Sequence, residues 1–148
     1  MDNDELKKHR EDVLRRHREQ CKKCKEVPPH KWKLCEVGRI LSCIGNKVTF
    51  KYPEGDRTGI LVDRMVIESA NEDGAVPYWD VVDLMEFEKE KEKWLRIGYY
   101  RKPKKSLVFG GQTSITETIS IWKKILVNTA REKKWFRDIL VDVMKELK

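Results

Sequence analysis

Residues 60–87, ILVDRMVIESANEDGAVPYWDVVDLMEF, contain two apolar runs on either side of a short polar segment. The runs at 60–68 and 79–87 are rich in the β-branched and aromatic residues that strands favour. The segment NEDGA between them has the residue types of a turn. The alternation is imperfect, and the second run would also fit a short helix. We therefore predict two neighbouring strands, with a helix over 79–87 as the alternative.

A hairpin is predicted before this pair of strands. Residues 36–52, EVGRILSCIGNKVTFKY, have two apolar runs around a tight turn at Gly45 and Asn46. A two-residue turn places Cys43 opposite Val48, on a face shared with other apolar residues. Cys43 is therefore predicted to be a buried core residue.

Two more strands are predicted after the pair. Residues 94–101 alternate, a basic turn follows at 102–105, and the chain returns over 106–111. Together with the hairpin and the central pair, these strands bring the predicted total to six short strands with close turns. Such a pattern is typical of a small barrel or a strongly curved sheet.

Helices are predicted at both ends of the chain. Residues 4–25 carry a thin apolar stripe at helical spacing, and two prolines follow. Ser114 and Glu117 have the spacing of a capping box, and helical periodicity continues to residue 147 with a break near 131–134. The sequence thus predicts an α+β fold with an N-terminal helix, a small curved β-sheet or barrel-like centre, and C-terminal helices. Residues 1–36 would form a basic helical arm, and residues 37–148 a single α+β domain.

The charge of the chain is unevenly distributed. The total of +7 divides into +3 for residues 1–36, −4 for residues 37–93 and +8 for residues 94–148. A basic surface of this kind favours nucleic acid as a partner, although lysines also serve simply as a solvated exterior. Lysine and glutamate dominate the charges and glutamine is nearly absent, which resembles the composition of thermophile proteins.

Nothing in the sequence predicts a membrane protein. No segment approaches the roughly 20 consecutive apolar residues that cross a bilayer. The first residues, MDNDELKKHRED, have no apolar signal-peptide core. We therefore expect a cytoplasmic protein, in which thiols are mostly reduced and metal binding or plain burial is favoured over disulfides.

Three of the four cysteines lie in one short segment, CKKCKEVPPHKWKLC, residues 21–35. Three thiolates and one imidazole form a normal tetrahedral zinc set. The first candidate set of metal ligands is Cys21, Cys24, His30 and Cys35. A second set replaces His30 with His17, because His17, Cys21 and Cys24 share one helical face. The alternative without metal is that these cysteines continue the packing stripe of the helix.

The spacing Cys-x2-Cys-x5-His-x4-Cys resembles the retroviral-type zinc knuckle, whose pattern is Cys-x2-Cys-x4-His-x4-Cys. The resemblance covers residues 21–35 only. One extra residue lies between Cys24 and His30, and Pro29 stands where the family normally has glycine. The resemblance implies zinc as the cofactor.

Two further segments are candidates for binding anions. In residues 94–105, WLRIGYYRKPKK, cations that can meet phosphates alternate with rings that can stack on bases, as in proteins that bind single-stranded nucleic acid. The candidate residues are Arg96, Tyr100, Arg101, Lys102, Lys104 and Lys105. The alternative is a hairpin with a solvated turn.

Backbone N–H groups before the C-terminal helix form a candidate anion site at Gly111, Gln112, Thr113 and Ser114, with a simple turn and helix cap as the alternative.

No catalytic motif is present. Asp80, Asp83, Glu86 and Glu88 cluster in sequence, but the Glu-x-Lys of restriction-type nucleases does not follow them. We therefore predict a non-enzymatic nucleic-acid-binding accessory protein with a structural zinc. The alternative is a protein–protein adaptor or homodimer, whose anchors would be aromatic residues of the C-terminal helices. These anchors are Trp122, Trp135 and Phe136.

Overall fold

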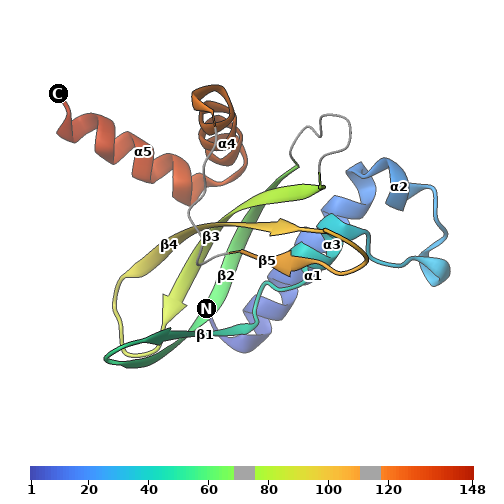
Figure 1. Cartoon of the computed structure of the whole chain (residues 1–148), viewed down its shortest axis with the longest axis horizontal. Helices are drawn as coiled ribbons and strands as arrows, with labels where there is room; N and C mark the ends of the chain where they lie inside the picture. The colour runs from blue at the N-terminus through green and yellow to red at the C-terminus, as the bar shows by residue number, and fades with distance from the viewer. Residues whose placement is uncertain (69–75, 111–117) are drawn as a thin grey trace.

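The computed structural model describes residues 1–68, 76–110 and 118–148 (Figure 1). The fold is α+β, as predicted. N-terminal helices precede an antiparallel sheet of five strands that curls into a half-barrel, and two helices follow the sheet. Among the described residues, no helix combines the length and the apolar character needed to span a membrane.

The N-terminal part consists of short helices around a break at Cys21. Helix α1 spans Asn3–Gln20, α2 spans Lys22–Lys25, the 3-10 helix η1 spans Pro29–Lys31, and α3 spans Glu36–Leu41. Helix α1 begins with a capping box, in which Asp2 and Glu5 each accept a hydrogen bond from the other's backbone N–H. Cys21 has an extended backbone, with φ −79° and ψ 121°, so the single helix predicted over 4–25 is divided there.

The sheet is a simple meander, in which each strand pairs with the next along the chain. The strands are β1 (Lys47–Tyr52), β2 (Gly55–Glu68), β3 (Tyr78–Phe87), β4 (Lys93–Arg101) and β5 (Val108–Phe109). All neighbours are antiparallel, and the central pair β2–β3 confirms the two strands predicted within 60–87. Strand β1 pairs only with residues 55–60 of β2, so the second half of β2 has a strand neighbour on one side only within the described chain.

The strand predicted over 36–44 is wrong, because this segment is helix α3 followed by turns. Its apolar residues Val37, Ile40, Leu41 and Ile44 recur at intervals of three and four, which is the period of a helix. Ile40 and Ile44 are fully buried on the sheet. Cys43 is only half-buried at the edge of this core, and its thiol donates to the carbonyl oxygen of Arg39 at 3.7 Å, so the predicted pairing with Val48 does not occur.

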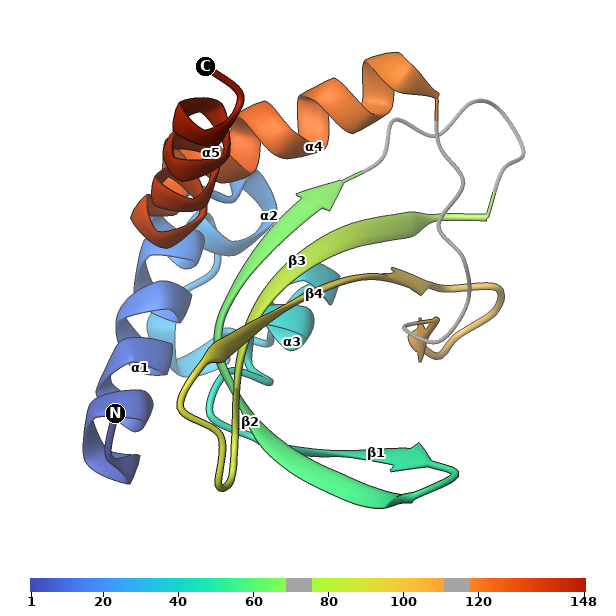
Figure 2. The ribbon, with the colours of Figure 1, turned by 90° about the vertical axis from the view of Figure 1, so that its left-hand side faces the viewer.

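A β-bulge in β2 determines which residues face each side of the sheet. The register against β3 shifts between Leu61 and Asp63, which leaves Val62 as an extra residue. After the bulge, Arg64 lies opposite Asp83 on the concave side of the half-barrel, where α3 also packs (Figure 2).

The outer side of the sheet is covered by the C-terminal helices α4 (Ile119–Glu132) and α5 (Lys134–Glu146). Ile125 and Phe136 from these helices pack against Ile67 and Val82. The helices meet at Lys133, which confirms the predicted break. Helix α4 is capped by Thr118. The capping box predicted at Ser114 and Glu117 lies outside the described residues.

Candidate metal centre and basic surface

Four side chains from three separate segments form one cluster. The ligand atoms of His17, Cys21, Cys24 and Cys35 all lie within 4.8 Å of one another. His17 Nε2 lies 3.1 Å from Cys35 Sγ and 3.8 Å from Cys24 Sγ. Tetrahedral ligands with a Zn–S bond of about 2.3 Å are themselves about 3.8 Å apart. The cluster therefore has the size of a zinc site.

Local backbone structure brings these ligands together. Helix α1 ends just after His17, and the backbone N–H of Cys21 donates to the His17 carbonyl oxygen at 2.8 Å. The break at Cys21 then turns the chain, so that the short helix α2 buries Cys24. Cys35 is the N-cap of α3, and its Sγ accepts a hydrogen bond from Gly38 N–H at 3.4 Å. A helix N-terminus and an N–H···S bond both favour the thiolate that a metal requires.

Gly38 allows α3 to approach the cluster closely. A Cβ at this position would lie 3.2 Å from Leu34 Cδ2 and 3.7 Å from His17 Cδ2. The first distance is tight, although the end of the Leu34 side chain can shift by a few tenths of an ångström, and the second is ordinary van der Waals contact. Gly38 therefore lies directly against His17, one of the candidate ligands.

The protonation of the ligands fits metal binding in part. Burial lowers the pKa of His17, which keeps its imidazole neutral, the form that binds metals. Burial would raise the pKa of Cys24, but Trp32, Cys21 and Cys35 stabilise its thiolate and bring the pKa below its ordinary value. Burial and the neighbouring thiolates raise the pKa of Cys35 to about 11 without a metal. A divalent cation would displace that proton.

Trp32 lies beside the cluster, with the guanidinium of Arg18 over its ring at 5.4 Å. Its indole N–H is buried and has no hydrogen-bond partner of normal geometry among the described residues. It contributes to lowering the pKa of the Cys24 thiol, as an N–H donor near a sulfur does. Donors around ligating sulfurs tune a metal site, so Trp32 is a supporting residue that sequence reasoning missed.

The cluster contains three of the four ligands in the first predicted set, with His17 in the position expected for His30. His30 is exposed on η1 and lies outside the group. The second predicted set is therefore the one that the fold brings together. The signal for it was the interval of four residues between His17 and Cys21, which places both at one end of α1.

A buried ion network crosses the concave face of the sheet. Arg64 is 1% exposed and donates to both carboxylate oxygens of Asp83, at 2.6 and 2.9 Å. Arg96 donates two hydrogen bonds to the same carboxylate, at 2.9 and 2.7 Å. Two guanidinium groups thus share one carboxylate, which leaves an excess positive charge on this face. The charged residues within apolar strands were the only sequence signal for this network.

Aromatic rings surround the more accessible arginine of this network. The guanidinium of Arg96 lies 4.7 Å from the ring centre of Phe109 and 5.4 Å from that of Phe50. The hydroxyl of Tyr100 accepts a hydrogen bond from Arg64, and its ring packs on Phe109. Tyr100 is therefore engaged within the protein, whereas Phe109 is exposed at the rim.

The basic turn between β4 and β5 lies at the edge of this concave face. Arg101, Lys104 and Lys105 are exposed. Lys102 is half-buried and forms an ion pair of 2.7 Å with Glu36, the residue after Cys35. The predicted nucleic-acid residues thus form an inner pair, Arg96 and Tyr100, and an outer basic turn. The predicted anion site at 111–114 lies outside the described residues.

Comparisons with models of protein families, with curated proteins and with solved structures found no match to this chain. Its function is therefore inferred from the site and surface geometry described above.

Proposed function

We propose that this protein binds one structural zinc ion and uses the basic, aromatic side of its half-barrel to bind single-stranded nucleic acid. The observation that carries the metal assignment is the convergence of His17, Cys21, Cys24 and Cys35 within 4.8 Å. All four cysteines of the chain are free thiols. Three cysteines and one histidine are a set that zinc prefers over harder cations.

The role proposed for the zinc is structural. Four protein ligands fill a tetrahedral shell, whereas catalytic zinc sites keep one position for water or substrate. The ligands come from α1, α2 and the N-cap of α3, so the ion would connect the short helix α2 to α1 and α3, which already share the apolar contact of Val13 with Leu41. The zinc would thereby fix the start of α3, which packs on the concave face of the sheet.

Metal content and stability test the zinc assignment, and two histidine variants distinguish the two ligand sets. Protein purified without added metal is expected to contain a single zinc per chain. His17→Ala and Cys24→Ser should lose it, whereas His30→Ala and Cys43→Ser, the matched controls outside the cluster, should retain it. Loss of zinc in His30→Ala with retention in His17→Ala would contradict the proposed ligand set. Zinc-free protein with unchanged helix content would contradict a structural role.

Support for nucleic-acid binding comes from the shared carboxylate of Asp83. Because two arginines share it, the concave face keeps a positive charge next to the rings of Phe50 and Phe109. The exposed cations Arg101, Lys104 and Lys105 extend this charge to the rim. Cations that track a backbone beside rings that stack on bases are the pattern of single-strand binding.

Binding of fluorescently labelled oligo(dT) and oligo(U) at several salt concentrations tests this proposal. Each lost phosphate contact should flatten the slope of log affinity against log salt by about 0.7. The variant Arg101→Ala/Lys104→Ala/Lys105→Ala should therefore flatten the slope by about 2 units. The matched control Lys91→Ala/Lys93→Ala/Lys145→Ala removes the same charge elsewhere and should change the slope little. Equal slopes for both variants would refute a role for this turn.

The adaptor or homodimer alternative has less support, because two of its three expected anchors are engaged inside the chain. Trp135 donates its indole N–H to Asp63 at 3.0 Å, and Phe136 is 2% exposed. Trp122 is half-buried in the same cluster as Phe136. Light scattering at increasing protein concentration would detect self-association, which we expect to be absent.

A further inference from the structure

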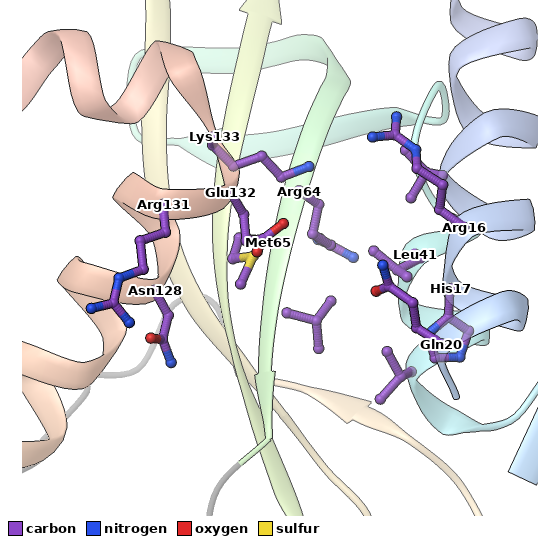
Figure 3. A pocket seen from close by; sticks show the side chains of 13 residues that line it. Arg16, His17, Gln20, Leu41, Arg64, Met65, Asn128, Arg131, Glu132 and Lys133 are labelled. Carbon is purple, nitrogen blue, oxygen red and sulfur yellow. The ribbon is translucent and has the colours of Figure 1, made fainter. Parts of the chain in front are cut away.

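A groove runs along the open edge of β2, between α1 and α4 (Figure 3). It consists of two cavities of about 510 and 430 Å³, which share His17, Gln20, Val37 and Val66 and are therefore continuous. Each volume lies within the range typical of binding pockets. The floor is the second half of β2, which has no strand neighbour on this side within the described residues.

Alternate residues of β2 direct their backbone N–H and C=O groups away from β3 and into this groove. Leu61 exchanges backbone hydrogen bonds with Gly45 and Asn46, on the side of β2 away from β3. The bulge inserts one extra residue after Leu61, so the same outward orientation recurs at Arg64, Val66 and Glu68. The N–H of Arg64 is taken by the Asp63 carboxylate. Among the described residues, none is found to pair with the N–H or C=O of Val66, which thus face the groove as a strand edge.

The walls of the groove carry unpaired positive charge. Arg16 from α1 and Arg131 from α4 line opposite walls (Figure 3). Both are exposed, and the described residues offer neither of them a hydrogen bond or an ion pair. Lys22 and Lys23 continue the positive charge along the second cavity. Three acidic residues also line the groove: Glu132, Glu68 and Glu36. Glu36 is paired with Lys102, and the other two do not balance these four cations.

We propose that this groove binds an extended acidic peptide segment of a partner protein, which adds to β2 as an antiparallel or parallel strand. Strand addition satisfies a free edge with main-chain hydrogen bonds, while side chains select the sequence. Acidic side chains of the peptide meet Arg16 and Arg131. A phosphodiester backbone fits this edge less well, because it offers only acceptors and would oppose the carbonyl oxygen of Val66. The inference does not rest on the nucleic-acid proposal, which uses Arg96, the rings beside it and the exposed turn after β4.

The test uses a fluorescently labelled peptide of alternating threonine and glutamate and the intact, zinc-loaded protein. We expect saturable binding, and the same peptide with lysine in place of glutamate should not bind. Arg16→Glu/Arg131→Glu should weaken binding by about tenfold or more, since it reverses two charges that face the ligand. The matched control Lys91→Glu/Lys93→Glu makes the same change of charge on a distant turn and should bind normally. Equal effects of the two double variants would overturn the proposal.

Hydrogen exchange separates strand addition from binding by charge alone. The amide of Val66 should exchange rapidly in the free protein and become protected when the peptide binds. Val66→Pro removes this outward N–H without removing a bond to β3, and should weaken peptide binding as well. Protection elsewhere with none at Val66 would refute strand addition. Direct binding of labelled oligo(dT) that is lost in Arg16→Glu/Arg131→Glu, without binding of the acidic peptide to the unchanged protein, would assign the groove to nucleic acid instead. Failure of the peptide to bind at about 1 mM would also overturn the proposal.

Discussion

The N-terminal arm, α1 to α3, and the central sheet are held together in different ways. The sheet buries Val81, Val82 and Met85 almost completely, and these residues lie on β3, which has hydrogen-bonded strands on both sides for almost its whole length. Helix α1 has 18 residues but buries only Leu6 and Val13. Its far end meets α2 and α3 mainly through the His17 cluster. The difference teaches that apolar burial can order the sheet and α3, whereas α2 and the far end of α1 would rely on the zinc proposed above.

Metal removal should have the largest effect and should separate the two regions. Structural zinc contributes roughly 10–16 kcal/mol of binding free energy in small zinc-binding peptides, far more than the apolar contacts of α2 can replace. We expect Cys24→Ser to abolish the amide protection of α2 and of the last turns of α1, while β3 stays protected. Hydrogen exchange measured by mass spectrometry reports both regions in one experiment. Cys43→Ser is the control, and protection of α2 in zinc-free protein would show that the arm does not need the metal.

The stability of the sheet should depend on one buried carboxylate, that of Asp83. Asp83→Ala leaves the guanidinium of Arg64 buried without its partner, which typically costs about 3–5 kcal/mol. We expect a decrease of this size in the free energy of unfolding, measured with urea, and no loss of bound zinc. Asp138→Ala breaks an exposed ion pair with Lys134 and should cost less than about 0.5 kcal/mol. Similar costs for the two variants would mean that the buried network contributes little.

The junction between the arm, the sheet and α5 should be sensitive to acid. Burial would raise the pKa of Asp63, but His9, Lys133 and Trp135 outweigh it and hold the pKa well below its ordinary value. A lowered pKa means that the stabilisation is complete above about pH 4 and is lost as the pH falls toward the folded-state pKa. Asp63→Asn should lower stability at pH 7 by roughly 2 kcal/mol and flatten its fall between about pH 4 and 2. A wild-type pH profile in this variant would contradict the prediction.

The ion pair between Lys102 and Glu36 should have the smallest effect. It connects the end of β4 to the helix that Cys35 caps, but both side chains are more than a quarter exposed. Such pairs contribute at most about 1 kcal/mol and are screened by salt. Lys102→Ala should therefore lower stability slightly at low salt and not at high salt. Thermal melts at two salt concentrations measure this, and a large loss at high salt would indicate a packing role for the lysine stem.

Much of the sheet could be predicted from the sequence, because long apolar runs between turn residues allow few other structures. The secondary structure of the segment 36–44 was harder to predict. Its apolar positions have the period of a helix, but nine residues are too few to decide between a helix and a strand, and burial against the sheet settles the choice. The helix break at Cys21 could not be predicted either, since neither proline nor glycine lies there. The choice of His17 over His30 was equally hidden, because it depends on how the fold brings the distant Cys35 next to the end of α1.

The pairing of Arg64 with Asp83 could not be predicted either. It depends on the bulge at Val62, and a register without that extra residue would place Arg64 on the opposite face of the sheet. The sequence shows only that two charged residues interrupt apolar strands. Three-dimensional register was needed to show that they neutralise each other.

The meander order of the strands has a consequence for how the chain folds. Every strand pairs with its neighbour in sequence, so the sheet can grow by successive hairpins without closing a long loop. Topologies built from such local pairings fold faster than those that join distant strands. The cysteine and histidine ligands join positions up to 18 residues apart across two helix ends, no farther than sheet partners such as Gly59 and Phe87, but their contact would rely on the proposed metal. We therefore expect the sheet to assemble first, and the arm to reach its final order only when the metal arrives.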